Sequence, residues 1–348
     1  MSSKMTTPPA LTKEKIPFDL KNFLLNNAIY IVLVLLLIAI IMVNPQFLSI
    51  TNFNFILSQA STRVIIALGV AGIIVLGGTD LSAGRAVGLA GIISASLLQS
   101  TDYTLRIFAD LPALPLIMPL LLGIVFCMIF SMLHAAMVAK FKIAPFIASL
   151  GFQLVLYGVQ SIYFDAMNFG SPIGGLDRRY SNFVQGAFHL GGVRVPYIVI
   201  YATIVSIVIW FIWNHTSLGQ NMYAVGGNKE SAMISGVNIS LVTIIIYIIA
   251  GALYGFAGFL EAGRTGSATN SLGFGYELDA IAACVVGGVS LQGGIGKVGG
   301  VITGVLIFQV INYGLNFIGV NPYAQSLVKG AIILFAITID TQKYIKKR

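Results

Sequence analysis

Residues that could do catalytic chemistry are few and scattered in this chain. It has no Walker-type phosphate loop, no HExxH and no GxSxG motif, and the glycine-rich stretch 287–300 lacks the Lys-Ser/Thr ending that phosphate binding needs. Its three histidines show no ligand spacing, and Cys127 and Cys284 both lie in apolar runs, where cysteine is usually a small core residue. We therefore expect no catalytic residue, no metal site and no ATP hydrolysis by the chain itself.

Ionisable side chains within or beside the apolar runs are the next candidates. Lys329 lies inside the last run, Glu277 and Asp279 open the eighth, and Glu261 and Arg264 close the seventh. A charge buried in a bilayer is costly, so we expect Lys329 to have a partner or a cavity. An ion pair that fixes helix packing, or a side chain that reaches out to the interface, is favoured over a substrate contact.

The elements that must position these residues are membrane helices. Of the 348 residues, 57% are hydrophobic and only 9% are charged, whereas soluble domains average about 25% charged. This small number of charged residues cannot cover a globular surface. The sequence therefore predicts an all-α polytopic membrane protein. The net charge of +8 comes mainly from basic residues at loop ends and tails. These orient a chain in a bilayer, and we expect no nucleic-acid partner.

Apolar runs predict about ten transmembrane helices. The runs are 28–43 (extended upstream to 23), 64–76, 87–98, 114–139, 143–164, 196–213, 239–260, 278–289, 298–318 and 323–339. Two of them, 87–98 and 278–289, are short for a full crossing, so we expect broken or tilted helices that are buried in protein. The mixed stretch 44–61 is expected at the far interface.

The distribution of basic residues predicts that both termini are cytoplasmic. With that orientation, thirteen Lys and Arg fall in inner segments, Arg85 among them, and six in outer segments, Arg63 among them. The predicted organisation is a cytoplasmic tail 1–22 without a cleavable signal peptide, a transmembrane domain 23–340 and a basic cytoplasmic tail 341–348. Within the domain, 165–195 is a periplasmic loop and 214–238 is a cytoplasmic loop.

Glycines point to close packing and to an internal repeat. Small residues four apart, such as Gly84 and Gly88, let helix backbones approach closely in lipid and predict a compact Gly-packed bundle. Residues Leu76–Gly84 align with Val286–Gly294, each after an apolar run. Repeats are common in transporters and place the substrate path at their interface. The alternative is chance recurrence of Gly-Gly turns in a chain with 38 glycines.

The central loop carries the start and stop signals of one short helix. Asn228 can cap the N-terminus with its side-chain oxygen, Glu230 puts negative charge in the first turn, and Gly236 suits a left-handed C-cap. A helix of about eight residues does not hold itself together in water, so we expect it to dock on another surface. The alternative is an ordinary surface turn of helix.

Several stretches together resemble the permease subunits of ATP-binding-cassette importers. Residues 230–236 (ESAMISG) are close to the E-A-A-x-x-x-G pattern of these permeases, with Ser231 in place of the first Ala. The monosaccharide branch, of the ribose, xylose and galactose type, is similar to residues 216–227 (TSLGQNMYAVGG), 77–84 (GGTDLSAG) and 280–296 (AIAACVVGGVSLQGGIG). Within that branch, galactose and methyl-galactoside carriers are most similar to residues 260–273 (LEAGRTGSATNSLG) and 311–323 (INYGLNFIGVNPY). The resemblance runs from Asn44 to the C-terminus.

The resemblance implies a set of partners. This chain would form a homodimer in the bacterial inner membrane, with a periplasmic galactose-binding protein outside and a cytoplasmic sugar-class ATPase inside. That ATPase would bind ATP and Mg²⁺, and this chain would need no cofactor. The short helix would be the coupling helix, and its candidate contacts are Asn228, Lys229, Glu230, Ala232, Ser235 and Gly236. The downstream part of the E-A-A signature of other permease classes is absent, so individual contacts are not carried over.

The implied function is ATP-driven import of galactose, a methyl-galactoside or a related monosaccharide by alternating access. A neutral sugar needs hydroxyl-pairing polar groups and an aromatic face rather than a strongly charged site. Candidates along its path are Asn270, Asn312, Asn316 and Lys329. The alternatives are an ion-gradient-driven secondary sugar transporter, which the permease motifs disfavour, and a non-transporting membrane scaffold, for which so many packed spans are excessive.

Overall fold

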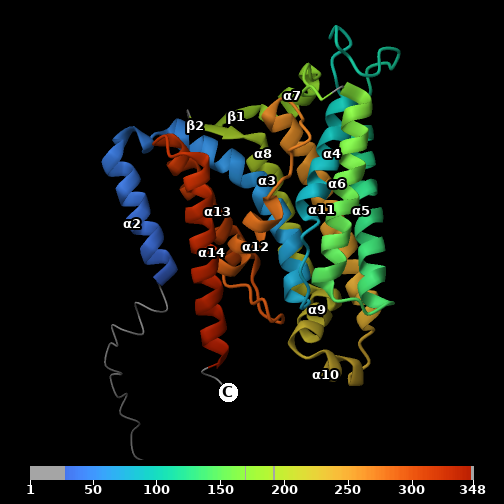
Figure 1. The fold of residues 1–348 in the computed structure, drawn as a ribbon, viewed down its shortest axis with the longest axis vertical. Coiled ribbons are helices and arrows are strands. Elements are labelled where there is room, and N and C mark those ends of the chain that lie inside the picture. The colour runs from blue at the N-terminus through green and yellow to red at the C-terminus, as the bar shows by residue number, and fades with distance from the viewer. Residues whose placement is uncertain (1–27, 169, 191–192, 346–348) are drawn as a thin grey trace, which may run out of the picture.

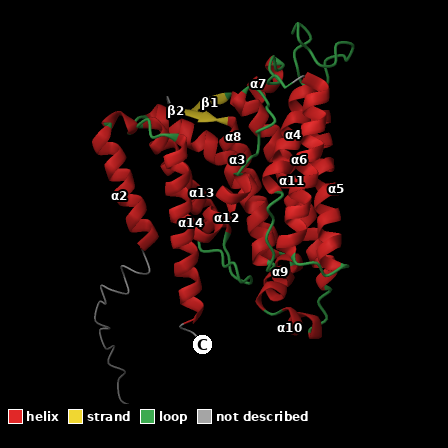
Figure 2. Cartoon of the chain, in the orientation of Figure 1, coloured by secondary structure: helices red, strands yellow, loops and turns green. Residues whose placement is uncertain are grey.

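The computed structural model describes residues 28–168, 170–190 and 193–345, and helices dominate it (Figures 1 and 2). One two-stranded antiparallel hairpin joins β1 to β2. In chain order the elements are α2 (Ala28–Val43), the 3-10 turn η1 (Pro45–Phe47), α3 (Ile50–Val75), α4 (Ala83–Leu97), α5 (Ile117–Ala139), α6 (Pro145–Asn168), α7 (Arg178–Gln185), β1 (Ala187–Leu190), β2 (Val193–Pro196), α8 (Tyr197–His215), α9 (Ser217–Gly227), α10 (Lys229–Ile234), α11 (Ile239–Thr265), α12 (Tyr276–Val286), α13 (Val298–Phe317) and α14 (Pro322–Ile345).

Each of the ten predicted apolar runs contains a helix. Within the described residues, six helices are long and apolar enough to cross a membrane, namely α3, α5, α6, α8, α11 and α13. The two runs predicted to be short are short helices, α4 with 15 residues and α12 with 11. The all-α prediction is confirmed, and the number of crossings stays a prediction.

Helix α3 begins further upstream than predicted. Residues 50–61 were expected at the far interface, but α3 starts at Ile50, where Ser49 Oγ accepts a hydrogen bond from Asn52 N at 3.2 Å. Arg63 therefore lies inside α3, and Arg85 lies inside α4, so neither belongs to a loop. Without Arg63 and Arg85, the sequence still assigns twelve basic residues to the predicted inner segments, the tails included, and five to the outer ones. The orientation stays a prediction.

The predicted loops and tails contain more structure than the sequence indicated. Stretch 165–195 holds α7 and β1, and 214–238 holds α9 as well as the predicted α10. The proposed tail at 341 falls inside α14, which runs to Ile345. The predicted tail 1–22 lies outside the described residues.

The core is built around α3 and α11. In the apolar 18-residue stretch of α3 that could cross a membrane, 83% is buried, against 22–28% of the corresponding stretches of α5, α6 and α8. Helix α3 is therefore central, and the other three are peripheral. Glycines bring α11 close to its neighbours: a Cβ on Gly255 would collide with the α5 backbone at Ile124, and one on Gly258 with the Val87 carbonyl of α4. The predicted Gly-packed bundle is confirmed at these crossings.

The two sides of the bundle differ. The start of α2 and the end of α14 lie on the side of α9 and α10, whereas α7 and the β1–β2 hairpin lie at the opposite end (Figure 1). These are called the α10 side and the α7 side below.

The two turns of the predicted repeat end their helices in the same way. Gly77 (φ +89°) follows α3 and Gly288 (φ +83°) follows α12. In both turns the residue after the left-handed glycine donates back five residues, Gly78 N to Ile73 O and Val289 N to Cys284 O, each at 2.9 Å. The sequence alignment paired Gly77 with Gly287, so the equivalent glycines differ from it by one residue. Because this cap is common, the duplication itself stays a hypothesis.

Candidate functional site at helix α10

The predicted short helix is present and carries the predicted caps. Asn228 Oδ1 accepts a hydrogen bond from Ser231 N at 2.9 Å, and Glu230 lies in the first turn. Gly236 is left-handed at φ +84°, and Val237 N donates to Ala232 O at 3.0 Å. The helix has six residues, fewer than the about eight expected.

Most of α10 is open to solvent. Of the six predicted contact residues, Ala232 is buried against the bundle at 4% exposure, and the other five are exposed. Sequence reasoning missed two apolar residues between them: Met233 is 60% exposed and Ile234 is 85% exposed. Their signal was present, because they are adjacent apolar side chains in an otherwise polar loop. Such a tip can bind an apolar groove on another protein.

Helix α9 ties α10 to the two glycine turns. A Cβ on Gly226 would collide with the Val75 carbonyl at the end of α3, and that carbonyl also accepts a hydrogen bond from Gly294 N at 2.8 Å. Tyr223 OH donates to Gly296 O at 2.8 Å. The turn after α3 and the turn after α12 therefore meet at the C-terminal end of α9, one residue before the cap of α10.

A cavity of about 840 Å³ lies beneath α10. It is lined by the end of α3, the α5–α6 connection, residues 225–230 with Met233, and the start of α11. Its inner end reaches Tyr247, whose side chain is 1% exposed and whose hydroxyl has no hydrogen-bond partner among the described residues. The α10 side of the bundle is thus hollow and partly polar.

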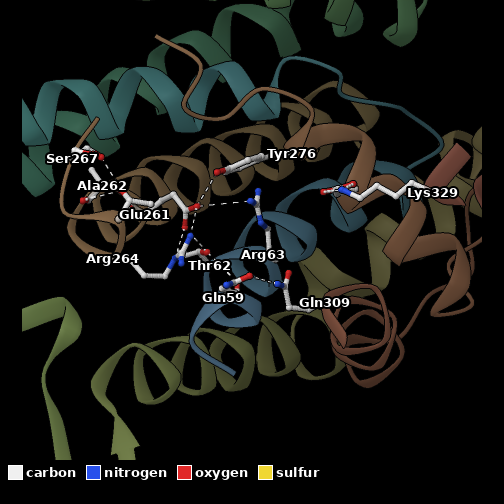
Figure 3. Close-up of polar contacts among 12 residues, drawn as sticks. Gln59, Thr62, Arg63, Glu261, Ala262, Arg264, Ser267, Tyr276, Gln309 and Lys329 are labelled. Atoms are coloured by element: carbon white, nitrogen blue, oxygen red, sulfur yellow. Dashed lines mark hydrogen bonds and ion pairs between the residues drawn. The ribbon is translucent and has the colours of Figure 1, made fainter. Parts of the chain in front are cut away.

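Near the α7-side end of α11, Glu261 is the centre of a buried polar cluster (Figure 3). Its fully buried carboxylate accepts hydrogen bonds from Arg264 at 2.8 and 3.0 Å, from Thr62 Oγ1 at 2.8 Å and from Tyr276 OH at 2.8 Å. Arg63 adds an ion pair at 3.8 Å and lies over the Tyr276 ring, 3.1 Å from its centroid. Both carboxylate oxygens are occupied, and the cluster joins α3, α11 and α12; Arg63 Nη1 is its one buried atom without a hydrogen-bond partner among the described residues.

The predicted path residues divide into two groups. Lys329 Nζ lies 3.3 Å from both carboxylate oxygens of Asp279, and Asp279 lines a small cavity together with Asn312, whose buried Oδ1 has no partner among the described residues. Asn316 Nδ2 donates to Asn312 O at 3.0 Å.

Asn270 is apart from that group, because its side chain bonds Ser161 of α6 at 3.1 Å. The expected partner for Lys329 exists, but the four residues do not form one site.

Comparison with known proteins gives one family. A family model described as "branched-chain amino acid transport system / permease component" matches residues 52–337. The galactose/methyl galactoside import permease protein of Haemophilus influenzae is 52% identical over 97% of this chain and 99% of its own length, and that of Escherichia coli is 50% identical over 94% and 97%. The ribose import permease protein of Haemophilus influenzae is 36% identical over 95% and 97%. No solved structure is similar.

Proposed function

Because the chain belongs to the family of branched-chain amino acid transport system permease components, the permeases of ATP-binding-cassette importers, we propose that it carries galactose or a methyl-galactoside into the cell. It is a multi-pass inner-membrane protein and a transport component rather than an enzyme. The relatives named for galactose are more similar to it than the one named for ribose, so galactose is favoured over other monosaccharides.

The proposed orientation puts the α10 side in the cytoplasm. Basic residues predominate in the segments on that side, as the positive-inside rule requires of cytoplasmic loops. The start of α2 and the end of α14 lie there as well (Figure 1), so both termini are proposed to be cytoplasmic. With this orientation α7 and the β1–β2 hairpin face the periplasm, where a galactose-binding protein would dock.

The observation that carries the proposal is the exposed, tethered helix α10. Met233 and Ile234 give it an apolar tip, and Gly226 seats the preceding helix on the α3 end. In the proposed assembly, two copies of the chain form the path, and each α10 inserts into a groove of a cytoplasmic ATPase that binds ATP and Mg²⁺. Closure of the ATPase moves α10 and α9, and the turns after α3 and α12 follow. The cavity then changes its side of opening, and the sugar crosses unchanged.

Reconstitution tests this function directly. Proteoliposomes containing the chain and a sugar-class ATPase, with a galactose-binding protein added, should accumulate galactose only when ATP is supplied on the ATPase side. Ribose and xylose should accumulate more slowly. Uptake driven by an ion gradient without the ATPase would establish a secondary transporter instead. Stable binding of the ATPase without flux of any sugar would establish a scaffold.

A further inference from the structure

Two short helices, α4 and α12, begin inside the bundle, and their starting turns lie against each other. At 1.5 Å per residue, α4 is about 22 Å long and α12 about 16 Å, too short for a 30 Å hydrocarbon layer. Their first turns pack on each other: a Cβ on Gly84 would collide with the Gly273 carbonyl just before α12, and one on Gly88 with the Leu272 carbonyl. Substrate sites in transporters often form where such discontinuous helices start.

The meeting point lies well below both surfaces of the bundle. Asp80, just before α4, accepts a hydrogen bond from Tyr254 OH at 3.1 Å, and the Val87 carbonyl packs on Gly258. Tyr254 and Gly258 belong to α11, which runs from Ile239 to Thr265. At 1.5 Å per residue, Tyr254 is about 22 Å from the α10-side end of that helix and about 16 Å from the other. The start of α4 is therefore at membrane depth, and Gly273 and Glu277 at the start of α12 pack against its Gly84.

An unbridged pair of opposite charges lies at this point. Glu277 is 4% exposed, and its Oε2, which lies against Gly84, has no hydrogen-bond partner among the described residues. Its Oε1 has one long contact, from Gln153 Nε2 at 3.4 Å. Arg85 donates to the Asn270 carbonyl at 3.3 Å, and no ion pair within 4.0 Å joins it to Glu277 in the described structure. Glu277 thus contrasts with Glu261, whose oxygens are both saturated.

Two aromatic rings, Tyr157 and Phe274, lie beside Arg85, and both are exposed on the surface of the bundle. The Arg85 guanidinium carbon is 4.3 Å from the Tyr157 ring centroid and 5.1 Å from that of Phe274. Tyr157 is 43% exposed and Phe274 is 68% exposed. Glu277 and Arg85, behind these rings, are 4% and 9% exposed, and ionisable groups buried at membrane depth commonly mark a substrate path or a protein contact. We therefore expect this face to adjoin water or the second copy of the chain.

We propose that Arg85, Glu277, Tyr157 and Phe274 form a contact site for the sugar on its way through the membrane. The Glu277 Oε2 would accept a sugar hydroxyl, Arg85 would donate to a second one, and the exposed Phe274 ring would pack on the C–H face of the sugar. Balanced charge and aromatic surface suit a neutral polyol better than an anion or a cation. This proposal rests on the proposed function, because it names the residues that the imported sugar would contact.

The test compares three variants in the reconstituted importer. Glu277→Gln removes the acceptor charge with its shape kept, and Phe274→Ala removes an exposed ring that the fold does not need. Phe146→Ala is the matched control, because it removes a 53% exposed aromatic ring of α6 that lies outside the proposed site. With binding protein preloaded with sugar, Glu277→Gln should lose about tenfold in galactose flux, the loss expected for one hydrogen bond to a charged group. Phe274→Ala should also lose galactose flux, because the ring contact with the sugar is missing. ATP hydrolysis stimulated by the binding protein should continue.

Deoxygalactoses that lack one hydroxyl each supply the second readout. Wild type should discriminate against the analogue that lacks the hydroxyl bound by Glu277, and Glu277→Gln should carry galactose and that analogue at equal rates. Unchanged flux and unchanged discrimination in both site variants, with a normal wild type, would overturn the site. So would loss of flux restricted to Glu277→Gln and dependent on a proton or Na⁺ gradient, which would indicate a cation site. A wild type without ATP-dependent flux would overturn the proposed function instead.

Discussion

At the scale of single residues, two buried glutamates show how neighbours decide the role of a side chain. Glu261 is held by Arg264, Thr62 and Tyr276 and has no free oxygen, whereas Glu277 has one oxygen without a partner. The first arrangement stabilises the junction of three helices. The second leaves a buried acceptor without a partner among the described residues, which the proposed sugar site uses.

Glu261→Gln should strongly destabilise the fold. The substitution removes the charge that compensates Arg264 and Arg63 in a buried site, and breaking such a pair costs about 3–5 kcal/mol. The apparent melting temperature of the purified protein in detergent should fall clearly below that of the wild type. Glu230→Gln on exposed α10 is the control and should melt with the wild type. Equal melting of Glu261→Gln and wild type would show that the cluster carries little stability.

At the scale of elements, local signals predict α10 and apolar runs predict the ten long or broken helices, whereas α9 and the buried charges depend on long-range packing. Asn228 and Gly236 cap a helix through their own side chain and backbone, so a sequence predicts them. Helix α9 was missed because its glycine-rich sequence is weakly periodic and Gly226 acts by packing on Val75, far away in the chain. The proximity of Arg85 and Glu277 at the starts of α4 and α12 has no local pattern either. The predicted path residues consequently included Asn270 but neither of these charges.

Ile234→Asp should prevent assembly with the ATPase and leave the fold intact. Ile234 is 85% exposed, so a charge there costs nothing in the isolated chain, but it would have to be desolvated in an apolar groove. The measurement is co-purification of the ATPase from detergent extracts. Ser217→Asp, exposed in the first turn of α9 and outside the proposed contact, is the control and should retain more ATPase. If the ATPase co-purifies with Ile234→Asp as it does with the wild type, the apolar tip is not part of the interface.

At the scale of the whole molecule, the orientation in the membrane follows from charge, and cysteine labelling tests it. The native Cys127 and Cys284 are 1% and 0% exposed, so a membrane-impermeant maleimide should not reach them. Ser235→Cys on α10 should react with the maleimide only in inside-out vesicles. Asp110→Cys, in the exposed α4–α5 connection, should react only in right-side-out vesicles. The reverse pattern would invert the proposed topology and place α10 away from any cytoplasmic partner.

The central claim is that α9 transmits motion from α10 to the glycine turns, and ATP hydrolysis and galactose uptake measured in the same proteoliposomes test it most directly. Gly226→Ala adds a methyl group that collides with the Val75 carbonyl, whereas Gly227→Ala meets nothing within 4 Å and is the matched control. We predict that Gly226→Ala hydrolyses ATP with little galactose uptake and that Gly227→Ala keeps both. Uptake in the wild-type ratio to ATP hydrolysis in assembled Gly226→Ala would contradict the account.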